Sequence, residues 1–191
     1  MSARITKEFA EDLGQSLGGC ASELTLGMYY KEAAYRSKAR LNVIPFLGMK
    51  KKRRFQVLWS CCMEAVAIRC AADRLPELRE NQKFYAKTLF QMQTYNNGVL
   101  SKAFLPYFSP EELQNFSRIR KDFVRLAEEP GTGKEEFARA FLKVLHADNP
   151  GIVDDALVSA LSSEIGLATN VFEKMIRIHL EKLDGKTPEN A

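Results

Sequence analysis

Residues 55–72 read FQVLWSCCMEAVAIRCAA, and this stretch decides the fold. Fourteen of its eighteen residues are apolar, and neither Gly nor Pro interrupts it. On a helical wheel Gln56, Ser60 and Glu64 form one narrow polar strip, because they are spaced four residues apart. The rest of the circumference is almost entirely hydrophobic. The sequence therefore predicts a helix that other helices cover on nearly every side.

Positive charge is concentrated directly before this helix and in the N-terminal quarter of the chain. Residues 1–54 contain 11 Lys/Arg and 5 Asp/Glu, whereas residues 55–191 contain 17 Lys/Arg and 19 Asp/Glu. The net charge of +4 therefore combines a basic first quarter with a slightly acidic remainder. Such an asymmetry is typical of a surface that faces a polyanion.

Helical periodicity covers most of the chain, and no segment shows the alternation of a half-buried strand. We expect an all-α fold, a compact bundle of seven or eight helices with short connections. At 191 residues the chain fits one domain. We expect a single helical domain over residues 1–184, in which 1–54 form a basic N-terminal region and 55–184 a helical core, followed by a polar tail over 185–191.

Two interpretations of residues 3–40 remain open. Apolar residues recur there every three or four positions, and beside them runs a row of small residues at four-residue steps: Ala10, Gly14, Gly18 and Ser22. Either the helix breaks near Gly18-Gly19, because glycine disfavours helix interiors, or the small row lets another helix backbone approach closely.

Local signals place the later helices. Ser109-Pro110-Glu111-Glu112 has the pattern of a capping box and predicts a helix to about Glu128. Thr132 to Glu135 repeats the pattern and predicts a helix to about His146. We also expect helices from about 76 to 96, ended by Asn97-Gly98, from Asn149-Pro150 onward, and from about 169 to 183.

No catalytic, cofactor or metal constellation emerges from the sequence. The turn at 129–134, EPGTGK, resembles a phosphate-binding loop only superficially, because a helix precedes it and Glu135 follows Lys134. His146 and His179 have no partner at ligand spacing, and we expect His179 on an apolar helix face. An enzyme with a helical pocket that contains Cys20, Cys62 or His179 is the least favoured possibility.

The cysteines and the N-terminal residues indicate a cellular compartment. Cys20, Cys61, Cys62 and Cys70 have neither disulfide nor zinc spacing, which favours a reducing compartment. The charged N-terminus does not resemble a signal peptide. Glu64 and Arg69 interrupt the best candidate for a membrane span, so we expect no transmembrane segment. The prediction is a cytoplasmic protein.

The basic region supports the leading functional hypothesis, a non-enzymatic module that contacts a nucleic-acid backbone within a larger complex. Aromatic residues are interleaved with its cations, and the competing interpretation is a solvated helix face with buried aromatics. The candidate polyanion-binding residues are Lys50, Lys51, Lys52, Arg53 and Arg54, together with Arg36, Lys38 and Arg40. A possible second basic face consists of Arg118, Lys121 and Arg125.

Other negatively charged partners fit the same residues. An acidic protein surface or an anionic membrane surface would also attract a cluster of four to eight cations. The alternative function is a regulatory or adaptor protein that binds a protein partner through an apolar helical groove. Its basis is the twelve Phe residues, the small-residue row and the apolar segment 103–108.

Overall fold

The computed structural model describes residues 5–30, 37–41, 49–183 and 185. Over these residues the chain contains seven α-helices and no strand, which confirms the all-α prediction. The helices are α1 (Lys7–Tyr30), α3 (Met49–Arg74), α4 (Pro76–Glu80), α5 (Gln82–Ala103), α6 (Pro110–Glu128), α7 (Lys134–Leu145) and α8 (Asp155–Leu183). Two short 3-10 segments, η1 (Leu105–Tyr107) and η2 (Pro150–Ile152), join neighbouring helices.

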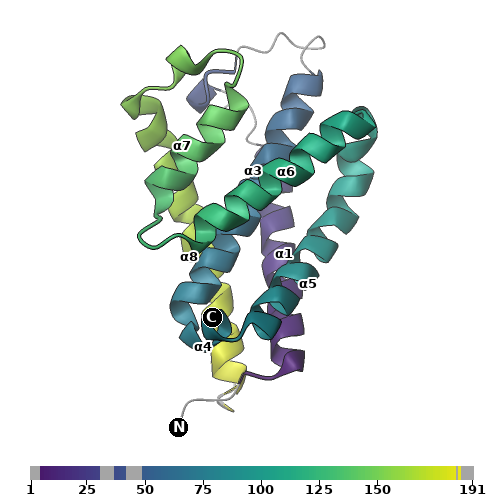
Figure 1. The fold of residues 1–191 in the computed structure, drawn as a ribbon, viewed down its shortest axis with the longest axis vertical. Coiled ribbons are helices and arrows are strands. Elements are labelled where there is room, and N and C mark those ends of the chain that lie inside the picture. Colours follow the sequence, from purple (N-terminus) through teal and green to yellow (C-terminus); the bar gives the residue numbers. More distant parts are fainter. Residues whose placement is uncertain (1–4, 31–36, 42–48, 184, 186–191) are drawn as a thin grey trace.

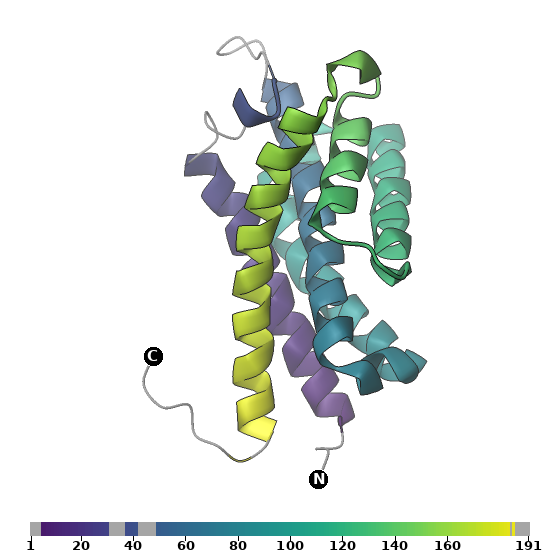
Figure 2. The ribbon, with the colours of Figure 1, turned by 90° about the vertical axis from the view of Figure 1, so that its left-hand side faces the viewer.

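Four helices run along the long axis of the molecule: α1, α3, α5 and α8 (Figure 1). Helix α6 crosses α3 diagonally, and α7 packs against α8 and α3. Figure 2 shows α8 beside α1 and α3 on the opposite side from α6. Helix α3 therefore lies at the centre, in contact with every other long helix.

The predicted central helix is present and longer than expected. Within 55–72 only Arg69 is not buried, so the polar strip is buried along with the apolar residues. The basic run forms the first turns of the same helix rather than a preceding loop. By length and composition α3 could also cross a membrane, which our sequence analysis did not expect, but 94% of the relevant window is buried in the bundle. The environment is that of a core helix.

The small-residue row is a helix contact and does not mark a break. Helix α1 continues through Gly14 and Gly18, and α5 lies directly against both. A Cβ at Gly14 would lie 2.5 Å from the backbone oxygen of Thr88, and one at Gly18 would lie 2.7 Å from that of Met92. The close-approach interpretation is therefore confirmed.

The predicted stop at Asn97-Gly98 is wrong. Helix α5 continues to Ala103, and Leu100 and Phe104 beyond the expected stop are each only 1% exposed. Their burial outweighs the local preference for a helix end. A break that the sequence analysis did not predict occurs at Asn81, whose side chain accepts hydrogen bonds from the backbone of Lys83 and Phe84.

Two further boundaries differ from the predictions. Helix α6 has the expected capping box, in which Ser109 and Glu112 exchange hydrogen bonds. The second box lies one residue later than predicted, because Gly133 is the N-cap of α7 and its N–H donates to Glu136. The segments expected to be separate helices after position 149 form η2 and the single 29-residue helix α8.

The buried polar strip joins four helices. Asn96 of α5 donates hydrogen bonds to Ser60 and Glu64 of α3 and accepts one from Ser22 of α1 at 2.8 Å. Arg120 of α6 reaches Glu64 with 3.0 Å between Nε and Oε2. Burial raises the pKa of Glu64, while Arg120 and Asn96 oppose that shift. Through Arg120 this network links α6 to α3.

Candidate polyanion-binding surface

One end of α3 and the outer face of α6 enclose an open polar hollow of about 850 Å³. Lys50 lines it from α3, and Arg118 and Lys121 line it from α6. The remaining lining residues are Ser109, Glu111, Glu112, Gln114, Asn115 and Ser117. We call this feature the basic hollow. It brings together members of the two basic stretches that the sequence analysis singled out.

The side-chain pattern of α6 places these cations outward. Phe116, Ile119 and Phe123 are buried against the core, so Arg118 and Lys121 lie on the solvent side of the helix. Arg120, one position along from Ile119, instead turns to the buried Glu64. The same helix therefore anchors itself with one arginine and presents another to solvent.

A carboxylate already neutralises one cation of the basic hollow. Lys50 Nζ lies 2.8 Å from Glu112 Oε1, and the N–H of Ser109 donates to the other oxygen at 2.9 Å. The Lys50 ammonium and the Ser109 N–H together lower the pKa of Glu112 to about 2. Arg118 donates to the neutral amide of Asn115 at 2.9 Å, and within the described ranges Lys121 has no ion-pair partner. Arg118 and Lys121 are thus the cations of the basic hollow that have no carboxylate partner among the described residues.

The other cations of the 50–54 run have varied surroundings. The Arg53 guanidinium lies between two rings, with Cζ 5.2 Å from the Phe104 centroid and 5.0 Å from that of Tyr107. Arg54 donates to the carbonyl of Val144 at 3.5 Å. Lys51 is exposed and Lys52 half-buried. Tyr107, 49% exposed, puts an aromatic ring at the same end of the molecule.

The more N-terminal candidates lie elsewhere. Lys38 pairs with Glu164 of α8, and Arg40 pairs with Asp154 at 2.7 Å, just before α8. Arg36 falls outside the described residues. On α6, Arg125 pairs with Asp122 at 3.5 Å. Of the predicted residues that the structure describes, Lys50, Arg118 and Lys121 line one hollow together.

Two features behind the adaptor alternative are packed within the protein. Helix α5 lies against Gly14 and Gly18 of the small-residue row of α1, and within 103–108 the rings of Phe104 and Phe108 are buried.

The residues considered for catalysis are buried. Cys62 is fully buried, and Cys20 is 8% and His179 3% exposed. His179 Nδ1 lies 3.0 Å from the carbonyl of Met175, so Nδ1 carries the hydrogen. Its Nε2 can then accept from Ser16 at 3.1 Å or, when protonated, donate to Asp12 at 3.1 Å. This contact ties α1 to α8, and we infer a structural role for it.

Among the described residues no group of three or more His, Cys, Asp or Glu side chains is placed to hold a metal ion. Comparison of the chain with protein-family models, with curated proteins and with solved structures returns no match.

Proposed function

We propose that the chain is a helical binding module whose basic hollow contacts a polyanion, and that the polyanion is a nucleic-acid backbone. The observation that carries this proposal is the convergence of Lys50, Arg118 and Lys121, from two helices distant in sequence, on one open polar hollow. Phosphate oxygens accept hydrogen bonds from Lys and Arg without regard to base sequence. A hollow with polar walls suits a solvated backbone better than it suits an apolar ligand.

The exposed ring of Tyr107 supports a single strand as the partner. Arg53 and Lys50 lie one helical turn apart on α3, and Arg53 contacts Tyr107 while Lys50 lines the basic hollow. A strand whose phosphates occupy the hollow could stack a base on this ring. Stacking of this kind tolerates any base, which agrees with backbone binding.

Salt dependence of binding tests the proposal. Fluorescence anisotropy of a labelled oligonucleotide of about 20 nucleotides measures affinity between about 50 and 200 mM salt. Because Lys50 is already paired with Glu112, we count two phosphate contacts, by Arg118 and Lys121. They predict a slope of log K against log salt of about −1.4 for a single strand and about −1.8 for a duplex, or a loss of roughly 7- to 12-fold over this range. The double variant Arg118→Gln/Lys121→Gln should bring this slope close to zero.

A matched variant supplies the control. Lys174 and Arg177 on α8 border a different hollow, and Lys174→Gln/Arg177→Gln removes the same charge. If both double variants weaken binding equally, attraction follows total charge and the basic hollow is not the site. If the oligonucleotide does not bind but an acidic peptide or anionic vesicles do, the nucleic-acid assignment is wrong.

A further inference from the structure

A second hollow lies where α3, α7 and α8 meet, and the proposed function does not use it. It measures about 520 Å³, within the range of small-molecule sites. It shares no lining residue with the basic hollow. We call it the α7 hollow, because the turn before α7 forms one of its walls.

The floor of the α7 hollow is apolar. Val66 from α3, Phe137 from α7 and Ile165 from α8 line it, and each is at most 2% exposed. Leu167 also lines it and is 62% exposed, more than any other large apolar side chain in the described ranges. An apolar floor with an exposed leucine beside it can cover the hydrocarbon portion of a ligand.

Thr132, in the turn before α7, also lines this hollow. Thr132 is 8% exposed, and among the described contacts its side chain makes no hydrogen bond. It is not the N-cap of α7, since Gly133 takes that position and has no side chain to offer. Its oxygen is not among the fully buried side-chain atoms that lack a hydrogen-bond partner, so it remains accessible from outside the protein. A ligand acceptor within the hollow can therefore accept a hydrogen bond from it.

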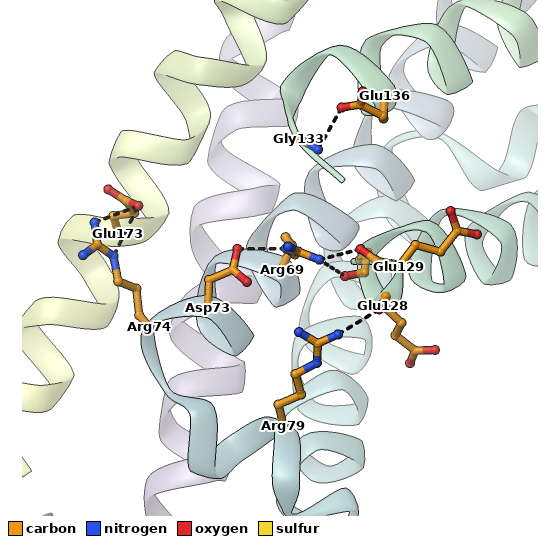
Figure 3. Close-up of polar contacts among 10 residues, drawn as sticks. Arg69, Asp73, Arg74, Arg79, Glu128, Glu129, Gly133, Glu136 and Glu173 are labelled. Carbon is orange, nitrogen blue, oxygen red and sulfur yellow. Dashed lines mark hydrogen bonds and ion pairs between the residues drawn. The ribbon is translucent and has the colours of Figure 1, made fainter. Parts of the chain in front are cut away.

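An arginine in a fixed position borders the same space. Arg69 donates from Nε to Asp73 at 2.8 Å and from Nη1 to the carbonyls of Ala127 and Glu129 at 3.2 and 2.7 Å. Figure 3 shows its guanidinium between Asp73 and the end of α6, where Arg79 donates to the carbonyl of Glu128. These bonds hold Arg69 in place before any ligand arrives, so little side-chain entropy is lost on binding.

The α7 hollow has one cation that is not compensated. Asp73 is paired with Arg69, and Glu173 is paired with Arg74 at 2.9 Å. Lys134, also in the lining, is exposed and has no carboxylate partner among the residues that the structure describes. Its side chain passes over α8, with Cδ 3.8 Å from the position of a Cβ at Gly166.

The start of α7 already stabilises one anion. Glu136 accepts the N–H of Gly133 at 2.8 Å, which lowers the pKa of its carboxyl group. Since the first turn of a helix has four N–H groups without a helical acceptor, others remain near Lys134.

We propose that the α7 hollow binds a small amphipathic anion, with a carboxylate or phosphate-ester head held by Thr132 and Lys134 and an apolar body on Val66, Phe137 and Ile165. The ligand is small because the space is small. It is anionic because the Lys134 charge, the one uncompensated charge of the described lining, is positive. Its body is apolar because Val66, Phe137 and Ile165 line the same space, together with Leu167.

Titration of the ¹⁵N-labelled full chain followed by NMR tests this site with four probes: phenyl phosphate, phenylacetate, inorganic phosphate and benzyl alcohol. We expect saturable shifts at the amides of Gly133, Lys134 and Leu167 with the first two probes. Phenyl phosphate binding more tightly than phenylacetate would identify a phosphate ester as the head, and the reverse order a carboxylate. Benzyl alcohol or inorganic phosphate binding as tightly as the amphipathic anions would overturn the proposed ligand class.

Matched substitutions place the ligand. Thr132→Val removes the hydroxyl and keeps the shape, and should weaken binding about 10-fold or more, as loss of a hydrogen bond to a charged group does. Thr132→Ser keeps the hydroxyl and should restore affinity. Lys134→Gln should weaken binding of both anions, whereas Lys143→Gln, in the last turn of α7 and outside the lining, removes the same charge and should leave binding unchanged. Binding that is indifferent to Thr132→Val and Lys134→Gln, or no binding by any probe, would refute the site.

Discussion

The close contact of α1 with α5 makes a specific prediction about glycine. In an exposed helix Gly→Ala stabilises a protein by about 1 kcal/mol, because alanine has the higher helix propensity. At Gly14 the new methyl group would lie 2.5 Å from the backbone oxygen of Thr88, and at Gly18 it would lie 2.7 Å from that of Met92. Real Cβ atoms essentially never approach below 3.0 Å, so α1 and α5 would have to move apart.

The expected magnitude follows from two opposing effects. Overpacking of a core contact costs about 1–3 kcal/mol, and here the obstacle is backbone, which cannot turn aside as a side chain can. The 2.5 Å approach to backbone puts the cost in the upper part of that range, about 2–3 kcal/mol. After the propensity gain of about 1 kcal/mol is subtracted, Gly14→Ala should destabilise the fold by about 1–2 kcal/mol. Gly27 lies in the same helix, and no atom of the described residues comes within 4 Å of its Cβ position, so Gly27→Ala should stabilise by up to about 1 kcal/mol.

Urea unfolding followed by circular dichroism measures both effects. The two variants should shift the midpoint in opposite directions with an unchanged m-value. For a chain of this size, each kcal/mol corresponds to about 2–4 °C in Tm, so thermal unfolding is an independent check. If Gly14→Ala is as stable as Gly27→Ala, steric contact with α5 does not explain why glycine occupies that position.

Three further predictions concern buried and paired groups. Arg120→Met leaves the fully buried Glu64 without its cation and should destabilise the fold by about 3–5 kcal/mol. The double variant Glu64→Leu/Arg120→Met should recover most of that loss, because no buried charge is left unpaired. A double-mutant cycle by urea unfolding measures both effects. Burial raises the pKa of Cys61 to about 11 and that of Cys70 to about 12. Both thiols of the folded protein should therefore resist a disulfide reagent at about pH 8 and react fully in urea. Fast labelling of the folded protein would contradict their burial. Lys50 and the Ser109 N–H lower the pKa of Glu112 to about 2, so the stabilisation from the ionised Glu112 is present above the ordinary pKa of 4.5 and is lost as pH falls toward 2. Glu112→Gln should therefore lower Tm at about pH 6 but not near pH 2. An equal effect at both pH values would be inconsistent with the ion pair.

Much of the fold follows from local pattern. The apolar circumference of 55–72 requires neighbours on all sides, and α3 indeed contacts every other long helix. The Ser109 capping box and the apolar spacing of α6 place Arg118 and Lys121 outward without reference to any other helix. A predicted helix boundary was wrong where burial opposed a local sequence signal. At Asn97-Gly98 the helix continues because Leu100 and Phe104 beyond it are buried in the core.

The sequence by itself determined helix content, the central helix and the outward face of α6, because each depends on residues within a few turns of one another. Only the tertiary structure decided which cations share a surface. Lys50 lines the same hollow as Arg118 and Lys121 because α6 packs across α3, where Arg120 pairs with the buried Glu64. Lys38 and Arg40 instead pair with carboxylates in and just before α8. Charge pairing depends on distance through space, and that distance is set by packing between helices far apart along the chain.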